Sequence, residues 1–278
     1  MKKFKATFKT LAFALMAMAI GNSAFADDAS QIAKTMLELN VPSYSYATLL
    51  MDVIEKDGKV EHRELKEYGG GDNGLKNAVF VFTSPASVKD TRILQAEKTN
   101  KDDDKWVYLP SLRTVRRLGS GDRSKPFVGS ELTYNDMSTR KIGDDTHEML
   151  SENEAVTVTS SEFGTVTYQT WKLKETPVKA KARDVEYAYR QLNIDKNTYL
   201  PVKIQTFDKK GTLLKTTVIE KIEKTTGNKG VYWLRKSVNI VNEQTGRKTH
   251  VKVADYTFDK KIPPSYFTQQ WLITGKAK

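Results

Sequence analysis

The feature that most restricts the fold of this chain is an alternation of side chains with a period of two, from residue 44 to residue 258. Such alternation is typical of strands that bury one face, and turn sequences such as Asp57-Gly58 interrupt it at short intervals. Short intervals favour antiparallel meanders over βαβ units. We expect about ten strands in all. The candidate segments are residues 44–54, 60–68, 78–83, 90–96, 106–109, 113–118, 155–160, 164–173, 184–193, 200–208, 212–222, 231–241 and 249–258.

One helix is expected near the start of the chain, over residues 28–39. Ile32, Met36 and Leu39 recur on one helical face, and Pro42 ends the segment. The chain is therefore expected to be mainly β (α+β), with one or two helices. A closed barrel, a sandwich or a strongly curved sheet wrapped over helices would each bury the apolar face of so many strands. The periodicity leaves these three architectures open.

Residues 1–26 have the three parts of a secretory signal peptide. Four lysines precede the apolar run at residues 11–20, and Ala24-Phe25-Ala26 is a small-x-small cleavage site. The run is too short for a membrane-spanning helix, which needs about 20 apolar residues. We expect cleavage after Ala26 and release of a single domain, residues 27–278, into the periplasm. No cysteine follows the site, so no lipid anchor is expected there.

The chain is basic and contains no cysteine. Its net charge is +11, and loss of the four lysines of the signal peptide, which has no acidic residue, leaves +7. A basic excess favours anionic partners such as lipid phosphates or an anionic membrane surface, although it also suits a merely solvated surface. Export makes nucleic acid an implausible partner. The absence of cysteine excludes disulfides, thiolate metal sites and a cysteine nucleophile.

Residues 105–137 combine basic, aromatic and glycine residues more densely than any other stretch. Arginine presents a planar fork that suits phosphate and carboxylate oxygens. One interpretation is a loop at the mouth of a cavity, where arginines bind an anionic head group or an acidic partner. The other is a solvated strand edge whose charges pair with nearby acids. The candidate ligand-binding residues are Trp106, Tyr108, Arg113, Arg116, Arg117, Arg123, Phe127 and Tyr134.

The same segment resembles the outer-membrane lipoprotein-sorting-protein-like family of exported bacterial proteins, whose fold is LolA-like. The resemblance rests on a W-x-Y-L-P…R-x-V-R-R core followed by an F-x-G-S-x-x-x-Y-x-D element, with Leu132 where an aromatic residue is common. Weaker matches extend it over about residues 30–272. The residues of the two motifs are Trp106, Tyr108, Leu109, Pro110, Arg113, Val115, Arg116, Arg117, Phe127, Gly129, Ser130, Tyr134 and Asp136.

The resemblance implies a half-open β-barrel, that is, a strongly curved antiparallel sheet with helices in its concave face and an apolar cavity. It also implies a monomeric periplasmic carrier of a lipid or lipoprotein acyl chain that works with an RND- or ABC-type transporter. The alternative is an adaptor without a ligand, which docks a transporter or envelope protein through the basic loop at residues 113–125. A cavity of several hundred Å³ would favour the carrier.

The sequence offers no clear catalytic or metal-binding motif, so we expect no enzyme activity, no metal and no cofactor. The three histidines lie far apart, without the spacing of known metal motifs. No nucleophile elbow or phosphate-binding loop occurs. A hydrolase would need a serine and a histidine brought together by the fold. Ser130 and His147 are the least implausible pair.

Overall fold

The computed structural model describes residues 22–71, 76–99, 101–138 and 140–276, with side chains described from residue 28 onward. Most of the predicted signal peptide, residues 1–21, lies outside this part. The described chain forms one antiparallel sheet of thirteen strands, so the expected number of about ten was too low. Each candidate segment overlaps one strand, although β7 begins at Asp145, well before the predicted residue 155, and β8 and β11 extend beyond their predicted ends. The strands are β1 (Ser45–Ile54), β2 (Val60–Gly70), β3 (Asn77–Ser84), β4 (Arg92–Ala96), β5 (Asp104–Leu109), β6 (Thr114–Arg117), β7 (Asp145–Ser160), β8 (Gly164–Pro177), β9 (Tyr187–Asp195), β10 (Pro201–Asp208), β11 (Leu213–Gly227), β12 (Gly230–Asn242) and β13 (Lys248–Phe258).

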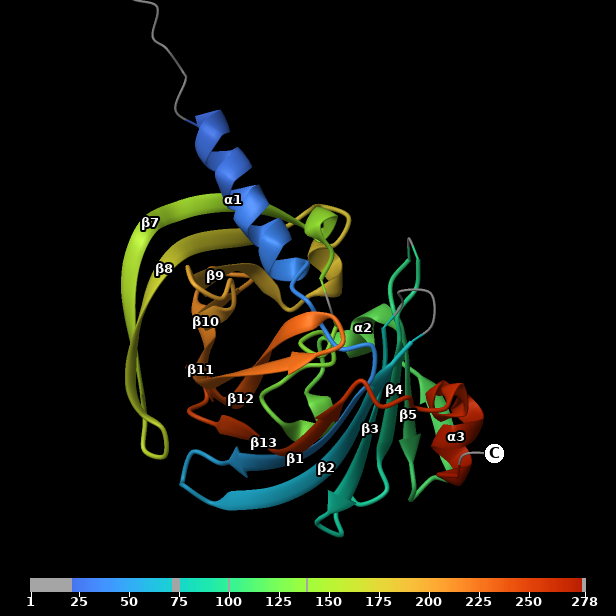
Figure 1. Ribbon diagram of the computed structural model, residues 1–278. Coiled ribbons are helices and arrows are strands. Elements are labelled where there is room, and N and C mark those ends of the chain that lie inside the picture. Colours follow the sequence, from blue (N-terminus) through green and yellow to red (C-terminus); the bar gives the residue numbers. More distant parts are fainter. Residues whose placement is uncertain (1–21, 72–75, 100, 139, 277–278) are drawn as a thin grey trace, which may run out of the picture.

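The strand order runs from β6 to β1, then from β13 to β7, so the first and last strands of the chain pair at the centre of the sheet. The sheet curves strongly around its inner side (Figure 1). β6 and β7 are consecutive in sequence but lie at its two opposite edges. Their connection must therefore cross the whole sheet. We call residues 118–137 of this connection the crossover segment.

The two faces of the sheet follow from the register of the strands. Met51, Leu65, Phe82, Ile93 and Val107 share what we call the inner face, and they belong to the largest buried cluster. The crossover segment packs on this cluster with its short helices α2 (Ser120–Arg123) and η1 (Phe127–Gly129). The inner face is thus covered by the chain's own connection between its two edges.

The opposite, outer face of β2–β6 is covered by the C-terminal helix α3 (Gln269–Thr274), which follows η4 (Pro264–Phe267). Buried Trp271 and Leu272 of α3 pack there against Val79 and Leu94. Thr268 accepts a hydrogen bond from the Trp271 amide at the start of the helix, and Gly275 ends it with φ at 65°, a backbone conformation that favours glycine. Figure 1 shows α3 outside the curved sheet.

Helix α1 (Asn22–Leu37) begins and ends earlier than the expected residues 28–39 and packs over the strands at the β7 end of the inner face. Its buried Ala29 and Ala33 lie four residues apart, and their small size lets the helix approach Leu173 and Leu192 closely. The packing residues all follow Ala26. Cleavage at the predicted site would therefore leave this contact intact.

The hairpin of β7 and β8 bends where its register shifts, between Met149 and Glu154. β8 pairs with β9 only from residue 170 to residue 175. Beyond the bend, Val156 and Val158 of β7 pack against Val202 of β10 in a separate buried cluster. Figure 1 shows this half of the hairpin running down the outside of the sheet. The remaining short helices are η2 (Ile142–Asp144) and η3 (Ala182–Asp184).

No helix in the described part of the chain is long and apolar enough to span a membrane.

Replacement of Leu173 by alanine should lower the free energy of unfolding by about 2–5 kcal/mol, because the side chain is fully buried beneath α1 and its loss leaves a cavity. Leu150→Ala, at a side chain that is 40% exposed, is the control and should cost less than about 1 kcal/mol. Urea denaturation of both variants measures the difference. Equal effects would show that α1 does not bury Leu173.

Candidate functional site

The centre of the inner face is the candidate site, because the crossover segment buries aromatic side chains against it. Phe127 is fully buried, with its ring 5.6 Å from that of Phe80 and 5.9 Å from that of Phe82. Tyr134 packs on the other side of Phe127, at 5.5 Å between ring centroids. Such contacts stabilise the segment by burial of apolar area and by edge-to-face geometry.

Hydrogen bonds from β2, from β13 and from the turn before β13 hold the middle of the crossover segment. The Arg63 guanidinium on β2 donates to the Val128 carbonyl at 2.6 Å. The Glu131 amide donates to Oγ1 of Thr249 on β13 at 2.9 Å, and the Glu131 carboxylate accepts from Arg247 at 2.7 Å. These contacts are local and polar. Each of these hydrogen bonds can therefore be replaced by a hydrogen bond to water without breaking the others.

The end of the crossover segment is held by an ion pair whose lysine is buried. Lys215 on β11 donates to the Asp136 carboxylate at 2.5 Å, and its side chain is only 7% exposed. Burial would lower the pKa of Lys215, but the charges of Asp136 and Glu186 raise it above its usual value. Burial opposes ionisation of Asp136 as well, and Lys215 outweighs it and lowers the pKa of that carboxyl. Both groups are therefore charged at neutral pH.

Further charged groups surround Lys215 on the same face. Glu186 has a carboxylate oxygen 3.7 Å from the Lys215 ammonium. The Arg190 guanidinium donates to Glu175 at 2.5 Å and lies 5.2 Å from the centre of the Tyr187 ring. Burial raises the pKa of Tyr187 to about 12, so its hydroxyl keeps its proton.

Several buried polar atoms of this group have no hydrogen-bond partner among the described residues. They are the Tyr187 hydroxyl, the Arg190 Nε and both carboxylate oxygens of Glu186. Buried polar groups are normally paired with protein or with ordered water. The cluster thus has unused donors and acceptors.

Two hollows in the described part of the chain are relevant to the site. One borders the crossover segment, and the other lies near the start of β1. A groove of about 560 Å³ is lined by Val53, Val60, Pro85, Arg63 and Arg247, among others. Since its two arginines bind the crossover segment, the groove opens beside that segment. Its volume is within the usual range for small-molecule sites, about 300–1,000 Å³.

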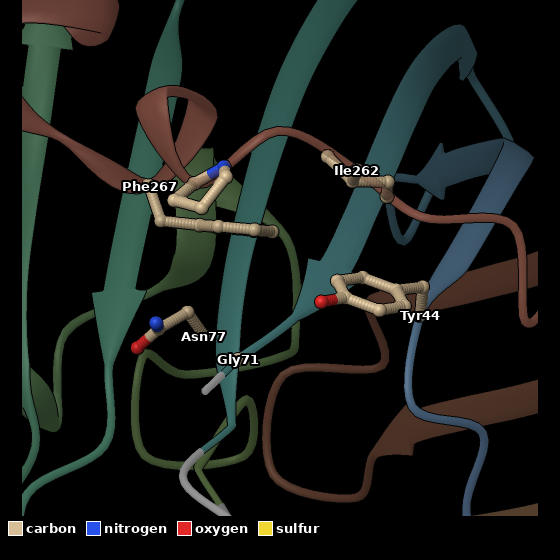
Figure 2. Close-up of a pocket in the computed structure, with 6 residues that line it drawn as sticks. Tyr44, Gly71, Asn77, Ile262 and Phe267 are labelled. Atoms are coloured by element: carbon tan, nitrogen blue, oxygen red, sulfur yellow. The ribbon is translucent and has the colours of Figure 1, made fainter. Parts of the chain in front are cut away.

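The second hollow is smaller, about 100 Å³, and lies between the start of β1 and the C-terminal segment. Figure 2 shows the rings of Tyr44 and Phe267 on opposite sides of it, with Ile262 above and Gly71 and Asn77 below. It is below the usual size of a ligand site.

The predicted ligand-binding residues do not form one cluster. Phe127 and Tyr134 meet on the inner face, whereas Trp106 and Tyr108 belong to the outer-face cluster under α3. Val79 and Val81 lie in that outer-face cluster too.

The arginines of residues 105–137, which we call the central segment, also lie in two different places. Arg113, Arg116 and Arg117 are exposed on the edge hairpin of β5 and β6. Arg123 instead donates to the Asp103 carbonyl at 2.6 Å, with a side chain only 14% exposed. Arg123 therefore fastens α2 to a neighbouring loop, and the three others remain accessible.

The polar residues of the site that the sequence did not reveal are on distant strands. Arg63, Lys215, Arg190 and Arg247 occupy ordinary strand or turn positions among 45 lysines and arginines. Their only sequence signal is a charged residue at a position that should face inward. That signal requires knowledge of which face is inward, and alternation alone does not give it.

The serine and histidine proposed for a hydrolase are not hydrogen-bonded to each other. Ser130 donates to the Phe127 carbonyl at 2.8 Å, and His147 lies 3.7 Å from Glu175. Ser237 and His250 do meet, at 2.8 Å, but Glu220 lies 2.9 Å from the same Nε2 atom. In a catalytic triad the acid binds the other ring nitrogen. Ser237 is also fully buried, which keeps substrate away.

No group of three or more histidine, cysteine or acidic side chains with the arrangement of a metal site occurs in the described part of the chain.

Comparisons with known proteins agree with this architecture. A family model described only as uncharacterized protein-like matches residues 74–274. The chain belongs to this uncharacterized family. A comparison with curated proteins finds no match.

Solved structures similar to this family member have the LolA-like fold. One, described as a candidate outer membrane lipoprotein-sorting protein domain from Vibrio parahaemolyticus, is 25% identical with a TM-score of 0.77, over 89% of this chain and 99% of that one. A DUF1329 family protein from Desulfovibrio piger is 24% identical with a TM-score of 0.78, over the same shares. A LolA superfamily protein from Nitrosomonas europaea is 20% identical with a TM-score of 0.62, over 87% and 98%. The predicted resemblance is confirmed.

Glu67 on the inner face provides a pH test of the site. Burial raises the pKa of this carboxyl to about 6. The folded state therefore keeps a proton that the unfolded chain loses near pH 4.5, and the free energy of unfolding should fall as pH rises from about 4.5 through 6. Glu67→Gln removes this loss. Because Glu67 is only partly buried, the gain at pH 7 should be about 1 kcal/mol.

Urea denaturation of the Glu67→Gln variant at pH 4, 5, 6 and 7 measures this effect, with exposed Glu243→Gln as the control. Curves that run parallel to that of the wild type would show that Glu67 ionises as a solvated carboxyl does.

Proposed function

We propose that this protein is a periplasmic carrier that binds a lipid or acyl chain on the inner face of its sheet. The proposal rests on the observation that the chain's own connection covers that face. A continuous apolar cluster is covered by the crossover segment, which contributes Phe127, Leu132 and Tyr134. The segment is held mainly by side-chain packing and isolated polar contacts. The LolA-like fold supports the same role.

Ligand binding in this proposal requires the crossover segment to move. The described inner face is filled by protein side chains, and the groove of about 560 Å³ beside residues 128–131 is the opening next to it. An acyl chain would enter there and replace the aromatic side chains. Burial of the acyl chain would contribute about 0.8 kcal/mol for each CH₂ group. This gain offsets the lost packing of Phe127 and Tyr134.

The proposal places the protein between membrane components, without catalysis. Cleavage of the signal peptide would deliver it to the periplasm, and an RND- or ABC-type transporter in the inner membrane would supply or remove the lipid. The name of one similar structure mentions lipoprotein sorting. This chain differs from the true lipoprotein carriers in length and in its central motif, so the cargo here is proposed as lipid in general.

A second function is favoured by one observation, the exposure of the basic hairpin of β5 and β6. The side chains of Arg116 and Arg117 are 60% and 68% exposed, and Leu112 at the turn is 63% exposed. An exposed apolar side chain among cations is typical of a contact surface. We propose that this hairpin docks the carrier on its transporter. In the pure adaptor alternative, it is the only functional surface.

Locking the crossover segment should abolish ligand uptake. The chain has no cysteine, so Glu131→Cys with Thr249→Cys introduces a single possible disulfide at a place where the Glu131 amide already donates a hydrogen bond to the Thr249 side chain. We expect the oxidised protein to take up a fluorescent fatty acid at least about tenfold more weakly than the reduced protein, because the competent state is removed. Fluorescence titration measures both forms.

The two single-cysteine variants are the controls for oxidation itself. Equal uptake by the oxidised and reduced double variant would mean that the ligand does not need the inner face, and the carrier proposal would then fail.

Charge reversal separates docking from uptake. Arg116→Glu with Arg117→Glu should abolish sedimentation with inner-membrane vesicles, while uptake of a neutral lipid probe should stay within about twofold of the wild type. Arg116→Gln with Arg117→Gln is the matched control for loss of charge without reversal. Loss of probe uptake together with unchanged sedimentation would contradict the docking role.

A further inference from the structure

The crossover segment presents to the inner face the chemical groups of an anionic amphiphile. Its apolar part is Phe127 and Tyr134, which pack at 5.5 Å from each other against the buried cluster. Its anionic end follows two residues later, where Asp136 accepts a hydrogen bond from Lys215 at 2.5 Å. A molecule that replaces the segment must bind to the same surface. That surface is apolar at one end and cationic at the other.

Withdrawal of the segment changes the charge of this surface. Two cations lie on this surface, Lys215 and Arg190, with side chains 7% and 18% exposed. The nearby carboxylates are Asp136, Glu175 and Glu186. Removal of Asp136 takes away the closest partner of the buried Lys215 ammonium and leaves Glu186 at 3.7 Å as its remaining carboxylate. A neutral ligand would not replace the lost partner, and breaking a charge pair around a buried group is strongly unfavourable.

The same surface holds hydrogen-bond donors that the closed arrangement leaves unused. The Tyr187 hydroxyl, in a residue only 3% exposed, and the Arg190 Nε have no partner among the described residues. Tyr187 and Arg190 are in contact, with the guanidinium 5.2 Å from the ring. A carboxylate or phosphate has more acceptor oxygens than the single Asp136 contact uses. Both donors are therefore suited to an anion with several oxygens.

We infer that the inner face binds an anionic amphiphile whose carboxylate or phosphate takes the place of Asp136 at Lys215, with Tyr187 and Arg190 as further donors. This inference rests on the carrier function proposed above and names the chemical class of its ligand. It replaces the arginines of residues 113–123 as the head-group site. The ion pair of Lys215 and Asp136 is then an internal competitor of the ligand.

The test compares ligands that share one labelled acyl chain and differ in head group, with the fatty acid and its methyl ester as the pair that isolates the charge. A fluorescent fatty acid, its methyl ester and a phosphatidic acid with the same labelled chain are titrated into the mature protein at pH 7. We expect at least one of the two anions to bind about tenfold or more tightly than the ester. Preference for the fatty acid identifies a carboxylate site, and preference for phosphatidic acid identifies a phosphate site.

Variants assign the preference to Lys215. Lys215→Gln should bring the affinities for anion and ester within about twofold of each other, whereas Lys221→Gln, at an exposed lysine of the same strand, should keep the wild-type preference. Because Lys215→Gln leaves Asp136 without its cation, Asp136→Asn with Lys215→Gln serves as a second variant that keeps an amide hydrogen bond. Asp136→Asn alone should strengthen anion binding, because the competitor is lost.

The possible outcomes distinguish failure of this inference from failure of the proposed carrier function. Binding of all three probes with equal affinity would overturn the inference and leave the carrier function standing. A preference for anions that survives in both Lys215 variants would also overturn it. Failure of every probe to bind the wild-type protein would overturn the carrier function and the inference together.

Discussion

The pairing of β1 with β13 at the centre of the sheet is the constraint on which the rest of the molecule depends. It places the chain's two meanders side by side and leaves β6 and β7 at opposite edges. The connection between them must then cross a face of the sheet, and the apolar inner face is the one that gains from being covered. The cover of the proposed ligand site is therefore a consequence of the topology.

A cover made by the chain itself suits a carrier better than a fixed core does. The aromatic residues of the crossover segment supply packing that an acyl chain can replace, and its polar contacts with Arg63, Thr249 and Lys215 are separate and local. The closed arrangement protects the apolar face from water when no ligand is bound. The same reasoning explains why a groove of about 560 Å³ lies beside the segment, at the rim of the inner face.

The two surfaces of the central segment serve different purposes in this view. The exposed hairpin with Arg116 and Arg117 projects from the edge of the sheet, where it is accessible to a membrane partner. The following residues turn inward and carry Phe127 and Asp136 to the inner face. One stretch of sequence thus connects the proposed docking surface to the cover of the proposed ligand site. Its density of arginines and aromatic residues reflects both.

The sequence by itself determined the positions of the strands, since alternation with a period of two depends only on neighbouring residues. It also singled out the central segment, in which Phe127 and Tyr134 proved to be the buried part. Tertiary structure alone decided that Trp106 and Tyr108 face outward under α3, and that Lys215 meets Asp136 from 79 residues away. The physical reason is that alternation assigns residues to two faces without saying which face is buried by what. Only the order in which the strands pair makes that choice.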